Sequence, residues 1–518
     1  MRASVRAGLA GVVAAGAAIG VAELIAVFTG AASSPLVAVG GVVVDHVPAS
    51  VKDFGIAVFG VHDKTALVIG TAILLGLYSY GVGLLAGRGR WVMAVAGIGL
   101  FGLAGAAAAV SREGVGPAGA LPSLIGAAVA AAVLWGLRAG YQRDGSEART
   151  PGRAEPAGEV IAPYEKESRR RFLRDLGIVA AVAAGAGVAG RMLSSRRAVD
   201  VARQQVALPV AVESAPPLPS GVQAPGAVPY VTPNRDFYRI DTAIVTPQVD
   251  PATWTLRIHG MVRNPIEITW AELLRRPMVE RYLTLACVSN EVGDDLIGNA
   301  LWLGTPIKAL IDEADPLPEA DQAVQRSVDG WTCGTPTAAL RDGRDALLAI
   351  GMNGEPLPVA HGFPVRMVVP GLYGYVSACK WITEIELTRF ADFDAYWVPR
   401  GWSAQAPIKT QSRIDTPRGG SSRRAGPITI AGVAWAQHRG IAKVEVQVDD
   451  GPWEEASLAP AVSADTWRQW SHPWQATAGR HSLRVRATDS DGVTQIANAA
   501  PPAPDGATGW HQVEVTVE

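Results

Sequence analysis

The sequence predicts a multi-domain protein with an α-helical membrane region, then an α+β domain, then an all-β sandwich of the immunoglobulin type. The length of 518 residues is too great for one compact domain. Residues 7–140 are largely apolar with few charges, whereas most of the Trp, Asp and Pro residues lie beyond residue 200. In the last hundred residues, short runs of alternating apolar and polar side chains are separated by Gly, Asp and Pro turns, which is typical of a sandwich.

The apolar half, residues 1–140, contains four segments that are long enough to cross a bilayer, since about 20 apolar residues span its core. A fifth stretch over residues 35–47 is interrupted by Asp45 and His46, and we expect a short or re-entrant segment outside the membrane core. Glu23 lies inside the first span, where either a functional role or a snorkelling or protonated side chain explains it equally well. The four segments are residues 7–31, 65–87, 91–110 and 121–137.

The arginines outside these segments indicate the orientation. Arg2 and Arg6 precede the first span, Arg88 and Arg90 lie between the second and third, and many arginines follow the fourth. Positive residues concentrate on the cytoplasmic side, so the amino terminus is expected there. Residues 141–174, which mix arginines with acids, Pro and Gly, then predict a cytoplasmic linker.

A basic motif, Ser168-Arg169-Arg170-Arg171-Phe172-Leu173, precedes a weakly apolar segment over residues 175–192. The order resembles a twin-arginine export signal placed internally, and the alternative is an ordinary fifth span with a basic flank. Both interpretations predict a multi-pass protein of the cell membrane whose soluble half is extracytoplasmic. Residues 193–228, rich in Pro, Ala and Val without a helical or strand period, predict a tether to the membrane.

The composition argues against several classes of function. Lys plus Arg (46) nearly balance Asp plus Glu (48), so no basic field attracts nucleic acid as a partner. The three cysteines, Cys287, Cys333 and Cys379, lie far apart, which argues against a disulfide framework and against a c-type haem motif. His46 and His62 fall in loops rather than inside the spans, so we expect no membrane haem.

The most informative stretch surrounds Cys287. The run Leu283-Thr-Leu-Ala-Cys287-Val-Ser-Asn290 places this cysteine at the end of a strand, in a turn-prone loop. A thiolate there can ligate a soft or redox-active metal, and a rigid strand fixes its aim. A single cysteine is by itself more often a small buried hydrophobic residue. The surrounding sequence decides whether Cys287 is a metal ligand or a buried hydrophobic residue.

The order Cys-x-x-Asn, followed by Trp302-x-Gly304-x-Pro306, resembles the molybdenum domain of the sulfite oxidase family. Further matches extend this resemblance from Asn234 to the carboxyl terminus. It implies an α+β, sulfite oxidase-like molybdopterin domain over 229–417 and an Ig-like dimerisation domain over 424–518, with a homodimer as one expected assembly. It also implies a molybdenum–molybdopterin cofactor, one molybdenum per chain, with Cys287 as the protein's ligand to the metal.

Other motifs extend the resemblance to the pterin. Phe237-Tyr238-Arg239 resembles the aromatic-Arg segment near the pterin, residues 361–366 its pterin-binding core, and Lys380-Trp381 its Lys-Trp pair. A pterin phosphate needs cationic and donor groups, which these segments supply. The expected cofactor-binding residues are Phe237, Tyr238, Arg239, Cys287, Asn290, His361, Gly362, Arg366 and Lys380.

The resemblance implies a two-electron transfer of an oxygen atom to or from a small-molecule oxo donor or acceptor. The electron-transfer partner is not identified by the sequence. The family's catalytic tyrosine has no obvious equivalent, and Tyr373 and Tyr375 are the candidates by proximity. Cys287, Tyr373 and Tyr375 are therefore the expected catalytic residues.

The sequence also departs from sulfite oxidases after Asn290, where Glu291, Val292 and Gly293 follow instead of the arginines that help to form an anion pocket. We expect Glu291, Asp294 and Asp295 to make the entrance acidic and to favour a neutral substrate such as a sulfoxide. A sulfoxide reductase of the same family is therefore one alternative. A cofactor-free, Ig-like cell-surface binding protein on a membrane stalk is the alternative from another class.

Overall fold

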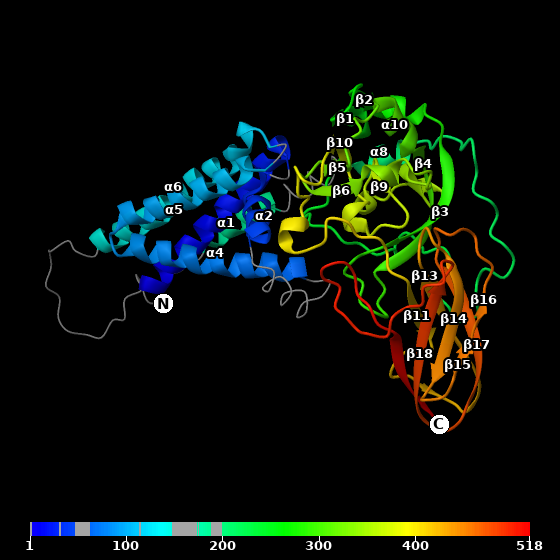
Figure 1. Cartoon of the computed structure of the whole chain (residues 1–518). Helices are drawn as coiled ribbons and strands as arrows, with labels where there is room; N and C mark the ends of the chain where they lie inside the picture. The colour runs from blue at the N-terminus through cyan, green and yellow to red at the C-terminus, as the bar shows by residue number, and fades with distance from the viewer. Residues whose placement is uncertain are drawn as a thin grey trace. The chain divides into compact units, whose positions relative to one another are not determined.

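The computed structural model describes residues 3–30, 33–46, 63–112, 115–147, 174, 176–187 and 199–518. The chain divides into two compact units (Figure 1). One holds the described residues up to 198 together with Ala243–Thr246, and the other holds Val199–Thr242 and Pro247–Glu518.

The first unit is a bundle of apolar helices. Within the described residues, four stretches are long and apolar enough to cross a membrane, and they match the four expected segments: 4–29, 69–87, 91–110 and 117–137. A Cβ added at Gly11 would lie 2.1 Å from the Ser79 carbonyl oxygen, so small residues let α1 and α4 pack closely. The helices are α1 (Ala3–Thr29), α2 (Pro35–His46), α4 (Asp63–Gly87), α5 (Trp91–Val110) and α6 (Leu121–Glu147).

Three sequence features of this half have different outcomes. The expected short segment over 35–47 is the 12-residue helix α2. Glu23 accepts a hydrogen bond of 2.5 Å from the Ser34 hydroxyl, so its carboxyl group has a polar partner inside the apolar bundle. A short apolar helix spans Leu176–Gly187, whereas Arg169–Arg171 lie outside the described residues.

The second unit begins with α8 (Val199–Gln205), which differs from the tether expected over 193–228. The Arg203 Nε atom donates to the Leu357 carbonyl at 2.7 Å, and its Nη2 atom pairs with Glu355 at 2.8 Å. Farther along, the Ala224 N–H donates to the Gln469 side chain at 2.7 Å. Hydrogen bonds from Arg203 and Ala224 therefore hold this segment against other parts of the second unit. Contacts between segments that are distant in the chain leave no periodic pattern in the sequence.

The α+β domain contains two sheets, as expected for a mixed fold. One has the order β2-β1-β10-β5-β6 and the other β3-β4-β7-β8, with β9 paired to β7. Only β1 and β10 pair in parallel within these sheets. The strands are β1 (Thr255–Gly260), β2 (Ile266–Thr269), β3 (Val279–Ala286), β4 (Ile297–Pro306), β5 (Gln322–Ser327), β6 (Thr332–Pro336), β7 (Leu347–Met352), β8 (Glu355–Pro356), β9 (Arg366–Val368) and β10 (Ile382–Thr388), with helices α9 (Trp270–Leu274) and α10 (Ile307–Ala314).

The carboxyl-terminal domain is a sandwich of two sheets, β11-β13-β17-β16 and β12-β19-β18-β14-β15. The fully buried Trp470 and Leu483 belong to its core. The sandwich starts at Gln411, before the expected boundary at 424, because β11 pairs with β13. Its strands are β11 (Gln411–Thr416), β12 (Ser422–Arg423), β13 (Gly426–Trp435), β14 (Ile441–Val448), β15 (Trp453–Glu455), β16 (Ser457–Leu458), β17 (Arg468–Ala476), β18 (Gly479–Asp489) and β19 (His511–Val517).

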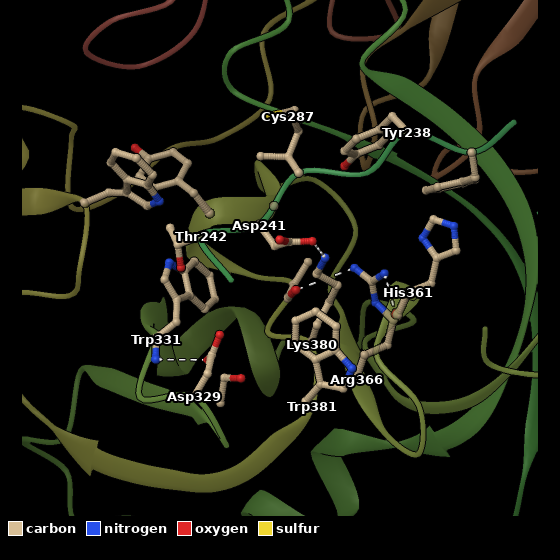
Figure 2. A pocket seen from close by; sticks show the side chains of 17 residues that line it. Tyr238, Asp241, Thr242, Cys287, Asp329, Trp331, His361, Arg366, Lys380 and Trp381 are labelled. Carbon is tan, nitrogen blue, oxygen red and sulfur yellow. Dashed lines mark hydrogen bonds and ion pairs between the residues drawn. The ribbon is translucent and has the colours of Figure 1, made fainter. Parts of the chain in front are cut away.

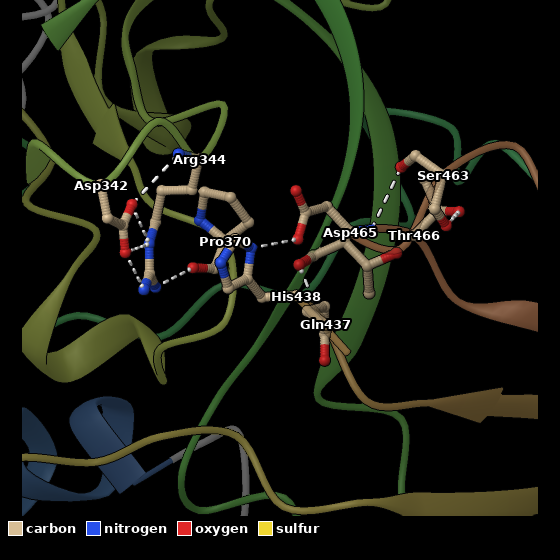
Figure 3. A network of polar contacts seen from close by, with 9 residues as sticks. Asp342, Arg344, Pro370, Gln437, His438, Ser463, Asp465 and Thr466 are labelled. Atoms are coloured by element: carbon tan, nitrogen blue, oxygen red, sulfur yellow. Dashed lines mark hydrogen bonds and ion pairs between the residues drawn. The ribbon is translucent and has the colours of Figure 1, made fainter. Parts of the chain in front are cut away.

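A polar network joins the sandwich to the α+β domain within this unit (Figure 3). Arg344 pairs with Asp342 at 2.6 Å and donates to the Pro370 carbonyl at 2.9 Å. From the sandwich, His438 lies 3.5 Å from Asp465, and burial raises the pKa of that carboxyl group. The direct link between the domains is made by Thr284 of β3, whose N–H donates to the Asp465 carbonyl at 3.0 Å and whose carbonyl accepts from the Gln437 side chain at 3.2 Å.

Candidate functional site

A cavity of about 110 Å³ in the α+β domain collects most of the expected site residues (Figure 2). Its wall is formed by the segment that precedes β1, the loop after β3, the turn between β5 and β6, and the chain on either side of β9. Phe237, Tyr238, Cys287, His361, Arg366, Tyr375 and Lys380 line it together with Ile240, Asp241, Thr242, Ser327, Asp329, Trp331, Gly374, Ala378, Trp381 and Trp397.

Cys287 lies directly after β3, as the sequence predicted, and the following loop is closed by hydrogen bonds. The Cys287 N–H donates to the Leu296 carbonyl at 2.9 Å, and the Asn290 side-chain oxygen accepts from the Leu296 N–H at 2.8 Å. Asn290 therefore holds this loop and does not line the cavity. Burial raises the pKa of the Cys287 thiol, and hydrogen bonds from Ser289 oppose this shift.

Arg366 brings a buried positive charge to the cavity. Its guanidinium donates to the carbonyls of Met367 at 3.3 Å, His361 at 3.1 Å and Ala378 at 3.5 Å. Within residues 199–518, all of which are described, no carboxylate pairs with it. Burial lowers the pKa of Arg366 to about 10. A buried cation whose partners are neutral carbonyls fits an anionic ligand such as a phosphate.

Lys380 faces Arg366 across an antiparallel bridge. Its Nζ atom lies 2.7 Å from Asp241, and both side chains are about nine-tenths buried. Burial lowers the pKa of Lys380 to about 8, although Asp241 opposes the shift. Arg239 pairs with the same carboxylate at 3.3 Å but is half-exposed and outside the lining, so only two of the three expected cations reach the cavity.

His361 and Gly362 shape the wall beside these cations. The His361 Nε2 atom lies 3.1 Å from the Asn234 carbonyl, and its ring meets Phe237 edge-on at 5.7 Å. Burial lowers the pKa of His361 to about 4, so the ring is neutral at pH 7. Gly362 has φ +112°, and a Cβ there would lie 3.0 Å from the Arg366 Cβ. Gly362 thus permits a close backbone approach.

The two candidate tyrosines differ in position. Tyr375 lines the cavity, and its hydroxyl donates to the Ser403 carbonyl at 2.6 Å. Tyr373 is buried outside the lining with its hydroxyl beside Gly506, and burial raises its pKa to about 12. Tyr238 also lines the cavity, and its pKa is raised by burial and by the nearby Cys287. Tyr238 and Tyr375 therefore face the cavity, and Tyr373 does not.

The expected acidic entrance is corrected by the structure. Glu291, Asp294 and Asp295 are exposed on the loop after Cys287 and do not line the cavity. The carboxylates in the wall are Asp241 and Asp329 instead. Asp241, Asp329 and Trp331 were not predicted from the sequence. The Asp329-Gly330 pair marks a turn between two strands, and this local signal could have revealed Asp329. No local signal marks Asp241.

The side chains of the cavity also indicate which kind of metal site it can form. Among the described residues, no group of three or more His, Cys, Asp or Glu side chains is placed to hold a metal ion. Among these residues, the cavity offers the single thiol of Cys287 rather than a closed set of protein ligands. A metal whose remaining ligands come from an organic cofactor fits this wall, since the cavity also carries cations and aromatic rings.

Comparisons with known proteins agree with this chemistry. Residues 243–397 match the family model described as the oxidoreductase molybdopterin binding domain. The uncharacterized oxidoreductase YuiH of Bacillus subtilis is 30% identical over 176 residues, which cover 33% of this chain and 85% of that protein. The chain belongs to the molybdopterin-binding oxidoreductase family. Residues 411–485 match bacterial Ig domains, which supports the Ig-like carboxyl-terminal domain.

Two further relatives and one solved structure are similar to parts of this chain. Mouse mitochondrial sulfite oxidase is 28% identical over 340 residues, 56% of this chain and 62% of that protein, so the match spans less than two thirds of its length. The protein-methionine-sulfoxide reductase catalytic subunit MsrP of Gluconobacter oxydans is 30% identical over 221 residues, 36% of this chain and 65% of that protein. The sulfane dehydrogenase SoxCD structure from Paracoccus pantotrophus shares the fold, with a TM-score of 0.50, 22% identity, and 56% and 82% coverage.

Proposed function

We propose that this protein is a membrane-anchored molybdenum–pterin oxidoreductase that catalyses two-electron oxygen-atom transfer. The observation that carries the proposal is that the Cys287 thiol and the buried Arg366 guanidinium line the same cavity. A soft thiolate suits molybdenum, and a guanidinium suits the phosphate of a pterin. The family match and the sulfite oxidase relatives support this assignment.

Each residue then has a defined role. Cys287 ligates the metal, Arg366 and Lys380 bind the phosphate, and neutral His361 holds the segment around Asn234 through its carbonyl. When bound, the molybdenum supplies the two-electron chemistry. Tyr375, whose hydroxyl donates to the Ser403 carbonyl, narrows the cavity, and the six Phe, Tyr and Trp side chains of the wall exclude water.

The substrate is a small oxo donor or acceptor, with sulfite oxidation as the first candidate. Sulfoxide reduction is the second, and the cavity wall favours it by charge. Lys380 is paired with Asp241, and Asp329 adds a second carboxylate beside aromatic rings. Once Arg366 is taken up by the pterin phosphate, the lining leaves no unpaired cation for an anionic substrate, and this favours a neutral one. The relative MsrP, a protein-methionine-sulfoxide reductase, supports this second candidate.

The four apolar helices anchor the protein in this proposal, with the catalytic domain on the extracytoplasmic side. A pterin inserted in the cytoplasm requires export of a folded domain, which a twin-arginine route through Arg169 and Arg170 permits. The sandwich supplies the surface for a homodimer. A separate electron-transfer protein completes the cycle.

The proposal is tested on the purified full chain in detergent. We expect close to one molybdenum and one pterin per chain, measured by elemental analysis and mass spectrometry. Turnover is then screened against sulfite, sulfoxides and nitrate with artificial electron donors and acceptors. Protein that carries no molybdenum after expression in a pterin-producing host would sink the proposal, and activity on one substrate class alone decides between the two candidates.

A further inference from the structure

The loop that carries Cys287 is held at its far end by the sandwich. Arg413 on β11 donates from Nη1 to the Asp294 carbonyl at 2.8 Å and from Nε to the Asp415 carboxylate at 2.7 Å. The side chains of Arg413 and Asp415 are more than nine-tenths buried. A charged donor with two acceptors and little access to water holds a fixed position, and the loop tip is held with it.

A second sandwich residue packs on the same tip. The His511 Nδ1 atom, on β19, accepts from the Ile414 N–H at 2.9 Å, so the ring orientation is set by β11. The ring lies against Gly293, where an added Cβ would be 2.3 Å from ring Cδ2. Gly293 has φ +92°, a conformation that favours glycine. The loop therefore turns in contact with the imidazole.

The sandwich also binds the strand on the other side of Cys287. Thr284, three residues earlier on β3, is fully buried. Its N–H donates to the Asp465 carbonyl at 3.0 Å, and its hydroxyl accepts from the Trp467 N–H at 2.8 Å. Its own carbonyl accepts from the Gln437 side chain at 3.2 Å. Both chain segments that flank Cys287 thus bond to the sandwich.

We propose that the sandwich domain fixes the position of the Cys287 thiol, with Arg413 and His511 as positioning residues. A metal ligand on a loop needs neighbouring groups that lock it, because small displacements change the metal's geometry. The role of the thiol as a ligand rests on the proposed function. The positioning itself rests only on the contacts described above and is measurable without cofactor.

Alkylation of Cys287 by iodoacetamide tests this in the full chain made in a host without pterin synthesis. Cys333 and Cys379 are fully buried and report global unfolding in the same sample. Arg413→Gln should speed alkylation of Cys287 by roughly tenfold, the factor expected when one hydrogen bond from a charged donor is lost. Gly293→Ala should also speed it, because the added Cβ meets the His511 ring and displaces the loop. Arg486→Gln is the matched control, because Arg486 pairs with Glu445 between β18 and β14 of the same sandwich, and it should change nothing.

The loaded enzyme gives a second readout. Loop variants should shift the electron paramagnetic resonance parameters of the pentavalent metal, and the control should not. Cys287 alkylation at the wild-type rate in both folded variants would overturn the proposal. If all three cysteines react in Arg413→Gln, that variant is unfolded. The alkylation rate of Cys287 is then measured in Arg413→Lys, which keeps the charge, and that rate decides the proposal. Wild-type protein without molybdenum would refute the proposed function, whereas the alkylation comparison would still judge the positioning.

Discussion

Replacing Arg366 by Met removes the buried charge of the cavity and keeps most of the side-chain volume. Burial lowers the pKa of Arg366 from 12.5 to about 10, which corresponds to a penalty of roughly 3 kcal/mol on the charged form. The guanidinium recovers part of this through three carbonyl contacts, the shortest 3.1 Å to His361, each contributing about 1 kcal/mol. The two contributions nearly cancel.

The free energy of unfolding of the cofactor-free protein should therefore change by less than about 2 kcal/mol in Arg366→Met. Cofactor binding should weaken by roughly 30-fold, because a charged donor to a phosphate is lost. Thermal unfolding of cofactor-free protein measures the first quantity. Molybdenum per chain after limited reloading measures the second.

Arg326→Met is the control variant in the same domain. Arg326 pairs with Glu384 at 3.1 Å and Glu386 at 2.7 Å, so its loss should cost up to about 1 kcal/mol of stability and leave molybdenum content unchanged. Wild-type molybdenum content in Arg366→Met would refute the assignment of this guanidinium to the cofactor. A stability loss above roughly 3 kcal/mol would instead show that Arg366 serves mainly the fold.

Three further predictions concern the thiol, the export signal and the histidine. Cys287→Ser should lower turnover by at least about 100-fold while the melting temperature of cofactor-free protein stays within a few degrees, and unchanged turnover excludes ligation. Replacing Arg169 and Arg170 together by Lys should keep residues 230–518 in the cytoplasm, where protease added to intact cells does not reach them. If these residues are still cleaved, the two arginines are only the basic flank of a membrane span. The pKa of His361 is lowered to about 4, so the unfolded chain binds this proton more readily. The free energy of unfolding should fall by up to roughly 3 kcal/mol between pH 6.5 and 4, and His361→Gln should flatten that slope; an equal slope in both proteins contradicts the burial argument.

The local pattern of apolar and polar residues was sufficient to predict the strand that carries Cys287. The apolar run before Cys287 predicted a strand, and β3 ends at Ala286, one residue before the thiol. Helix α10 (Ile307–Ala314) buries residues 307, 310, 311 and 314, a helical spacing of apolar residues that the sequence itself carries. These features depend on neighbouring residues, so periodicity in the sequence records them.

The remaining features depend on distant parts of the chain. Asp241 and Lys380 lie 139 residues apart, and no local pattern links them. The acids after Asn290 are close to Cys287 in sequence but are exposed on a loop whose tip is bound by Arg413. Residues 199–228 have no period of their own, because their positions come from contacts with other segments.

The pairing of β11 with β13 has a practical consequence for dividing this protein. A fragment that begins at residue 424, the boundary expected from the sequence, lacks β11, whereas the family match begins at residue 411 and includes it. The outer edge of β13 would then expose unpaired N–H and C=O groups along residues 431–435, which bind any free strand. Such fragments should form aggregates or strand-exchanged pairs, and any dimer observed with them would report the missing strand rather than the assembly of the intact chain.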